Sequence, residues 1–150
     1  MISKIERGES SPTTTVLGRL CGAFGITLST FLSRAEDHAG RLIRAAEQPS
    51  WTDPETGYVR TLISPSAGGP IEIVSVDLPA GAKVLFPASI YAVFHQTVWV
   101  LAGRLTLAEG ETEYHLDVGD CLELGPPSEC TFRNQTDKSC RYIVAAGRRV

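Results

Sequence analysis

The stretch VWVLAGRLTLAEGETEYHLDVGD, residues 98–120, carries the pattern that decides the fold. It contains short β-rich runs at Arg104–Ala108 and Glu113–Leu116, with Gly110 between them and Gly119-Asp120 after them. Short runs of this kind, separated by glycine or by Gly-Asp pairs, are typical of strands joined by turns. The stretch therefore predicts a succession of short strands.

The same alternation of short runs and turn signals continues on both sides of this stretch. Further strands are predicted over Arg41–Ala46, Tyr58–Ser64, Ile71–Leu78, Val93–Leu101, Cys121–Leu124, Cys130–Arg133 and Cys140–Ala145. Many short strands at even spacing predict a β-sandwich or a β-barrel. The 150 residues, 43% of them hydrophobic, suffice to bury a core of their own.

Four elements of this region resemble the two sequence motifs of the cupin family. They are Val100-Leu101-Ala102-Gly103, Gly119-Asp120, Pro126-Pro127 and Asn134, in the order and spacing of that family. The resemblance implies a double-stranded β-helix, which is a jelly-roll barrel. We therefore expect a mainly β chain with a cupin-like barrel.

The positions that bind metal in the cupin family hold other residue types in this sequence. Metal-dependent cupins place two histidines and a glutamate in the first motif and a histidine in the second. By the resemblance, these positions fall on Ser89 and Tyr91, or Ile90 and Ala92, then on Gln96, and finally on Cys130. A neutral amide and one thiol do not replace that ligand set, so we expect no metal, no cofactor and no enzymatic activity.

The side chains that the resemblance directs into the barrel form a candidate pocket for a small neutral molecule. The candidate ligand-binding residues are Tyr91, Gln96, Val98, Val100, Cys130 and Phe132. Strand alternation puts His95 on the opposite face from Gln96, so it points out of the barrel. The alternative is that these side chains simply fill the barrel. Cys130 is either a redox sensor or, as we expect, a buried thiol, because nothing nearby in sequence lowers its pKa.

The first twelve residues, MISKIERGESSP, indicate a second architecture. Ile2 and Ile5 share a helical face, Gly8 stands where a left-handed C-cap would, and Ser11-Pro12 is typical of a helix start. This helix, turn and helix resemble the second half of the helix-turn-helix in Cro/C1-type (XRE-family) repressors. In that family two helices and the front of the recognition helix precede the position of Met1, so we expect a partial motif.

The pattern after this motif predicts an amphipathic helix over residues 12–24, ended by Gly25, and then a short helix capped by Thr27 or Ser29. These helices match the bundle behind the recognition helix of the repressor family. Without the missing helices, Leu17 and Leu20 would be exposed or forced onto another surface.

The segment SRAEDHAG, residues 33–40, is polar and small, as in a linker. We therefore predict three parts: a partial all-α helix-turn-helix over 1–33, a linker over 34–40 and a cupin-like barrel over 41–150.

Alignment with the repressor family implies four DNA-binding residues: Ser3, Lys4, Arg7 and Thr13. Ser3 and Lys4 would face the groove, and Arg7 and Thr13 would lie near phosphates. Because such helices enter the groove with their first turns, this chain alone should bind DNA weakly or not at all. Tight, sequence-selective binding in a low-salt titration would contradict that expectation.

Composition restricts the classes of partner. The net charge of -3 disfavours nucleic-acid binding over the whole surface, although residues 1–33 are slightly basic. The four cysteines have no metal-ligand spacing and favour reduced thiols, with Cys121 and Cys140 in the core. No run approaches the roughly 18 apolar residues of a membrane span. We expect a cytoplasmic protein with no membrane association.

Together these patterns favour a DNA-binding transcriptional regulator whose cupin domain senses an unidentified small molecule. We expect a homodimer, because operators read by such motifs are usually two-fold symmetric. Two alternatives stay open: a stand-alone, metal-free cupin that binds a small molecule, and a metal-dependent cupin enzyme.

Overall fold

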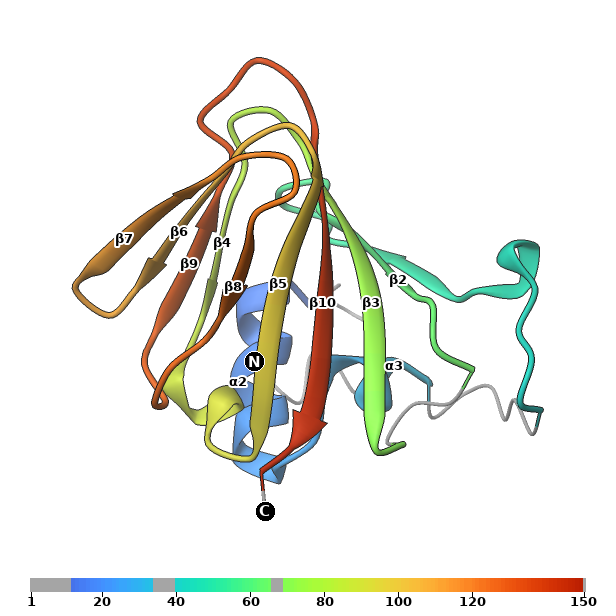
Figure 1. Cartoon of the computed structure of the whole chain (residues 1–150). Coiled ribbons are helices and arrows are strands. Elements are labelled where there is room, and N and C mark those ends of the chain that lie inside the picture. The colour runs from blue at the N-terminus through green and yellow to red at the C-terminus, as the bar shows by residue number, and fades with distance from the viewer. Residues whose placement is uncertain (1–11, 34–39, 66–68, 150) are drawn as a thin grey trace.

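The computed structural model describes residues 12–33, 40–65 and 69–149, and two antiparallel sheets dominate this part of the chain (Figure 1). The six-stranded sheet has the order β1-β2-β3-β10-β5-β8, and the four-stranded sheet has the order β4-β9-β6-β7. The strands are β1 (Ser50–Thr52), β2 (Val59–Leu62), β3 (Ile71–Leu78), β4 (Lys83–Phe86), β5 (Phe94–Ala102), β6 (Leu105–Glu109), β7 (Thr112–Leu116), β8 (Cys121–Glu123), β9 (Cys130–Arg133) and β10 (Cys140–Arg148). The predicted mainly β fold is confirmed.

Nearly all the predicted strands form, with ends displaced by a few residues, but the strand over Arg41–Ala46 is wrong. Residues 42–44 are irregular, and a short 3-10 helix, η1 (Ala45–Glu47), follows them. Leu42 is 60% exposed, so the segment has no inward face to bury against a sheet. The sequence pattern also missed β1 and β4, which have three and four residues.

Two residues of the cupin-like motifs stabilise turns between strands. Gly103, between β5 and β6, has a φ of 76°, and a Cβ there would lie 2.8 Å from the Ser139 carbonyl oxygen. Asn134 is buried and donates from Nδ2 to the carbonyl oxygens of Leu78 and Lys138, at 3.0 and 2.6 Å. Its Oδ1 accepts from the backbone N–H and the hydroxyl of Thr136. These motif residues therefore stabilise turns, and Asn134 hydrogen bonds the end of β9 to the end of β3.

The helix α2 (Thr14–Phe24) lies against one end of the barrel (Figure 1). Thr13 caps it by accepting from the Val16 N–H, and Gly25 ends it in the left-handed conformation, as predicted. The helix approaches the short 3-10 helix η2 (Ala88–Tyr91) so closely that a Cβ on Gly22 would meet the Ser89 side chain. Leu17 is fully buried, so the barrel is the surface that covers this helix.

The helix α3 (Leu28–Ser33) follows along the same end of the barrel, and Leu28 belongs to the same hydrophobic core as the strands. A buried hydrogen bond from Thr14 Oγ1 to Asp53 Oδ2, at 2.9 Å, also joins the helices to the barrel region. Residues 34–39 of the predicted linker lie outside the described residues, and the division into three parts stays a prediction. Within the described residues, no helix has the length and apolar character needed to cross a membrane.

Candidate functional site

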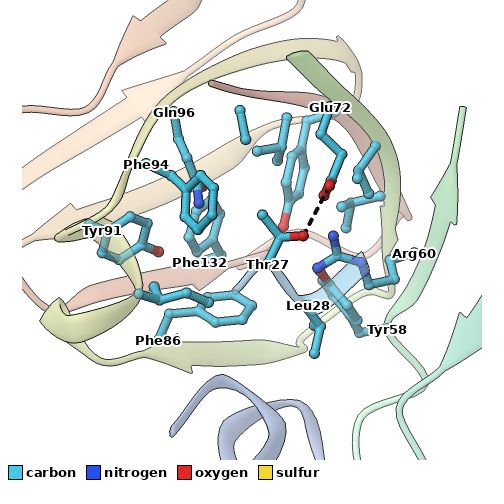
Figure 2. A pocket seen from close by; sticks show the side chains of 16 residues that line it. Thr27, Leu28, Tyr58, Arg60, Glu72, Phe86, Tyr91, Phe94, Gln96 and Phe132 are labelled. Carbon is cyan, nitrogen blue, oxygen red and sulfur yellow. Dashed lines mark hydrogen bonds between the residues drawn. The ribbon is translucent and has the colours of Figure 1, made fainter. Parts of the chain in front are cut away.

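A small internal cavity lies inside the barrel, at the end that α3 covers (Figure 2). Its volume is about 40 Å³, and its walls come from α3, η2 and strands of both sheets. Since one water needs roughly 10–15 Å³ of such volume, the cavity has room for about three waters. Only a compact molecule fits here unless the walls move.

Two charged side chains of the six-stranded sheet line the cavity. Glu72, on the inward face of β3, is only 3% exposed, and its Oε2 accepts from Thr27 Oγ1 at 2.9 Å. Arg60, on β2, donates from Nη2 to Ser29 Oγ at 2.8 Å and also hydrogen bonds the Tyr58 side chain. Figure 2 shows the Arg60 and Glu72 side chains on the same side of the cavity as Thr27. The polar wall therefore carries one negative and one positive group.

Aromatic rings make up most of the remaining wall. Phe132 stacks on Tyr142 with ring centroids 5.6 Å apart, and it meets Phe86 edge-on at 5.8 Å. Burial raises the pKa of Tyr91 well above its ordinary value, and a hydrogen bond with the Cys130 side chain raises it further. The Tyr91 hydroxyl is therefore protonated at neutral pH and is able to donate a hydrogen bond.

The structure brings three of the six predicted ligand-binding residues to this cavity. Tyr91, Gln96 and Phe132 line it, whereas Val98, Val100 and Cys130 are buried in the core without lining it. His95 is exposed on β5, on the opposite face from Gln96. A role in binding stays a prediction for all six residues.

Sequence reasoning missed the charged residues of the cavity. The sequence did contain a signal for Glu72. Side chains alternate along a strand, so the Glu72 side chain points to the same, inward face as those of Val74, Val76 and Leu78. A carboxylate on the same strand face as three buried apolar residues is a candidate for a functional site in the protein interior. For Arg60 and Thr27 the sequence held no such signal, because their proximity to Glu72 is created by the packing of distant segments.

The predicted DNA-binding residues Ser3, Lys4 and Arg7 lie outside the described residues. Thr13 is half-buried, and its hydroxyl caps α2. Next to it, Thr14 is fully buried against the barrel region. The first turn of α2 is therefore engaged in intramolecular contacts.

The residues at the metal-binding positions of cupins do not fit a metal in this chain. Gln96 lines the cavity, and the Cys130 side chain is hydrogen-bonded to Tyr91. Across residues 12–33, 40–65 and 69–149, no three His, Cys, Asp or Glu side chains are grouped as a metal ion would require. The neutral amide, phenol and thiol found here are a poor ligand set for a divalent cation.

The cysteines fall into two groups. Cys21, Cys130 and Cys140 are buried, and burial raises the pKa of each thiol to about 11. Cys121 is exposed on the edge strand β8, so its predicted place in the core is wrong. The edge of the sheet leaves that side chain uncovered.

We expect a maleimide reagent at neutral pH to label Cys121 alone in the folded protein. The thiolate is the reactive form, and the buried thiols are both protonated and inaccessible. Mass spectrometry should show one adduct in the native protein and four in denaturant, with no native labelling of Cys121→Ser. Prompt labelling of Cys130 in the native protein would instead support a redox-sensing thiol.

Comparison with known proteins agrees with both parts of this architecture. Residues 1–31 match the family HTH_3, a helix-turn-helix, which confirms the resemblance of the N-terminal segment. An HTH_3 family transcriptional regulator from Vibrio cholerae aligns with 99% of this chain and 80% of its own, with a TM-score of 0.77 and 20% identity. No curated protein matches the sequence.

Two further solved structures are similar to the barrel. The Cupin_2 domain of an XRE family transcriptional regulator from Enterobacter cloacae aligns with 62% of this chain and 98% of its own, at TM-score 0.57 and 15% identity. A predicted oxalate decarboxylase from Thermotoga maritima aligns with 72% of this chain and 99% of its own, at TM-score 0.58 and 10% identity. These likenesses confirm the cupin fold.

Proposed function

We propose that this protein is a DNA-binding transcriptional regulator whose cupin barrel senses a small molecule without a metal or other cofactor. The helix-turn-helix match over residues 1–31 supports the DNA-binding part. The cavity with its buried charged wall supports the sensing part. We propose further that the protein acts in the cytoplasm as a homodimer, since the operators of such motifs are usually two-fold.

The observation that carries this proposal is the single core that the barrel shares with α2 and α3. Leu17, Cys21 and Leu28 of the helical segment are buried with the strand residues. A closely packed interior transmits small displacements, because it has few voids to absorb them. A molecule that enters the barrel therefore changes the position or stability of the helices.

A selection from a random DNA pool tests the DNA-binding part. We expect the protein to enrich a two-fold symmetric sequence, and repeated rounds make the selection sensitive even for a partial motif. Replacing Lys4 and Arg7 with alanine should make DNA binding less dependent on salt. The slope of the logarithm of the binding constant against the logarithm of the salt concentration should fall in magnitude by about one for each phosphate that is no longer neutralised. The control pair Lys83→Ala and Lys138→Ala, exposed on the barrel, should leave the slope unchanged.

A second class of function is a stand-alone cupin that binds a small molecule and does not act on DNA. The buried Thr14–Asp53 hydrogen bond favours it, because the first turn of α2 is held by the barrel region. A small molecule that binds in the cavity without changing amide hydrogen exchange in α2 and α3, together with no enriched DNA sequence, would favour this class. A metal-dependent enzyme is a weaker third class, because Gln96 and Cys130 do not supply its ligands.

A further inference from the structure

The charged groups of the cavity also hydrogen bond to α3 and to the residue before it. Glu72 accepts from Thr27, which precedes the first residue of α3, and Arg60 donates to Ser29 in its first turn. Thr27 and Ser29 are 7% and 4% exposed, so neither bond is weakened by competition with bulk water. Any molecule that bonds to Glu72 and Arg60 from inside the cavity competes with α3 for them.

A second cavity, of about 60 Å³, adjoins the first on the side of the α2–α3 turn. Thr27, Glu72, Phe94 and Ala146 line both cavities, so the Thr27–Glu72 hydrogen bond lies in their shared wall. Figure 2 shows this hydrogen bond from the first cavity. Arg148, which also lines the second cavity, is exposed. Opening the Thr27–Glu72 bond would join the two cavities.

The Thr27 hydroxyl has a second acceptor within reach. Its oxygen lies 2.9 Å from Glu72 Oε2, and Thr30 Oγ1 lies at the same distance. The hydroxyl oxygen also accepts from the Thr30 N–H at 3.0 Å, which caps α3. If Glu72 turns to another donor, Thr27 keeps both a hydrogen bond and its capping role, so the Thr27 hydroxyl stays paired.

The wall also defines the class of molecule that fits. Glu72 requires a donor and Arg60 requires an acceptor, while Phe94 and Phe132 offer apolar surface. Because the two charges are opposite, an added ion would leave a buried charge without compensation, whereas a neutral group that both donates and accepts satisfies both. A primary carboxamide on a short apolar body has this chemistry and fits the combined volume.

We propose that the ligand site is formed jointly by the barrel and α3, and that a compact molecule without net charge binds by replacing Thr27 and Ser29 on Glu72 and Arg60, which releases α3. This inference rests on the proposed function, because it assigns the regulation of the same cavity. Ligand occupancy and the docking of α3 then exclude each other.

Amide hydrogen exchange followed by nuclear magnetic resonance tests the ligand class, with propionamide, propionate and propylammonium as probes of nearly equal size. Propionamide should shift the signals of cavity residues and speed exchange of the Leu28–Leu32 amides by about tenfold, leaving those of β10 unchanged. The two ions should bind at least about tenfold more weakly. Equal binding by either ion, or propionamide binding without faster exchange in α3, would overturn the inference.

Variants test the attachment of α3 without any ligand. Glu72→Gln keeps the side-chain shape and removes the charge, so exchange in α3 should rise by about tenfold. The matched control is Asp77→Asn, on the same strand but on its outer face, where Asp77 is paired with Arg141. Ser29→Ala removes only the hydrogen bond between Arg60 and Ser29, and it provides the same test if Glu72→Gln does not fold.

The outcomes separate this inference from the proposed function. If the amide hydrogen exchange rates of α3 are unchanged in both Glu72→Gln and Ser29→Ala, these two hydrogen bonds do not hold α3 on the barrel. That result overturns the inference even if the DNA selection succeeds. Absence of propionamide binding overturns the ligand class, and the DNA selection then still decides whether the protein is a regulator.

Discussion

Phe132→Ala is expected to lower the free energy of unfolding by about 3–5 kcal/mol, because it removes a ring from the centre of the barrel. Phe132 is 2% exposed and contacts rings on both sheets, Phe86 on β4 and Tyr142 on β10. The missing ring leaves a void beside the existing cavity, and a closely packed interior refills such a void only in part. Since whole domains are stable by only about 5–15 kcal/mol, this one change brings the protein near its stability limit.

Equilibrium unfolding in urea measures the effect of Phe132→Ala. The matched control is Phe24→Ala at the end of α2, where the ring is 69% exposed, and its effect should stay within about 0.5 kcal/mol. A loss below about 1 kcal/mol for Phe132→Ala would mean that the interior is loosely packed at this point.

Gly103→Ala is expected to lower the free energy of unfolding by about 2–4 kcal/mol through two separable effects. The φ of 76° disfavours any residue with a Cβ. In addition, the new Cβ would lie 2.8 Å from the Ser139 carbonyl oxygen and 3.0 Å from Cys140 Cα, both of them backbone atoms. Backbone in a strand-to-strand junction cannot move aside without disturbing the pairing of β10.

Gly81→Ala separates the two effects of Gly103→Ala. Gly81 has nearly the same φ, 74°, but a Cβ there would meet nothing within 4 Å. We expect this control to show only the conformational cost of roughly 1–2 kcal/mol. Equal losses at the two positions, measured in the same urea titration, would show that the contact with β10 contributes nothing.

The local features of the chain were readable from its sequence. The cupin resemblance placed Gln96 and Phe132 on inward faces, strand alternation put His95 on the face opposite Gln96, and the glycine after residue 24 marked the end of α2. Such features depend on neighbours one to four residues away, which leave a periodic or turn signal. The strand predicted over Arg41–Ala46 failed because the segment has β-forming residues but no partner face to bury.

The site depended on contacts between distant segments. Thr27 and Glu72 are 45 residues apart in sequence, and Ser29 and Arg60 are 31 apart. No local pattern records such a pair, so the polar wall of the cavity is known only once α3 packs on the barrel. The same packing buries Leu17, whose periodicity indicated a helical face but not the surface that covers it.

By itself, the sequence determined the class of fold, the positions of its turns and the presence of a helix-turn-helix segment beside a cupin-like barrel. Only the tertiary structure decided that the helices pack on the end of the barrel and that a buried carboxylate and a guanidinium line one cavity at this junction. The physical reason is that backbone propensity and alternation act over a few residues, whereas burial of charge is decided by whichever segments the chain brings together.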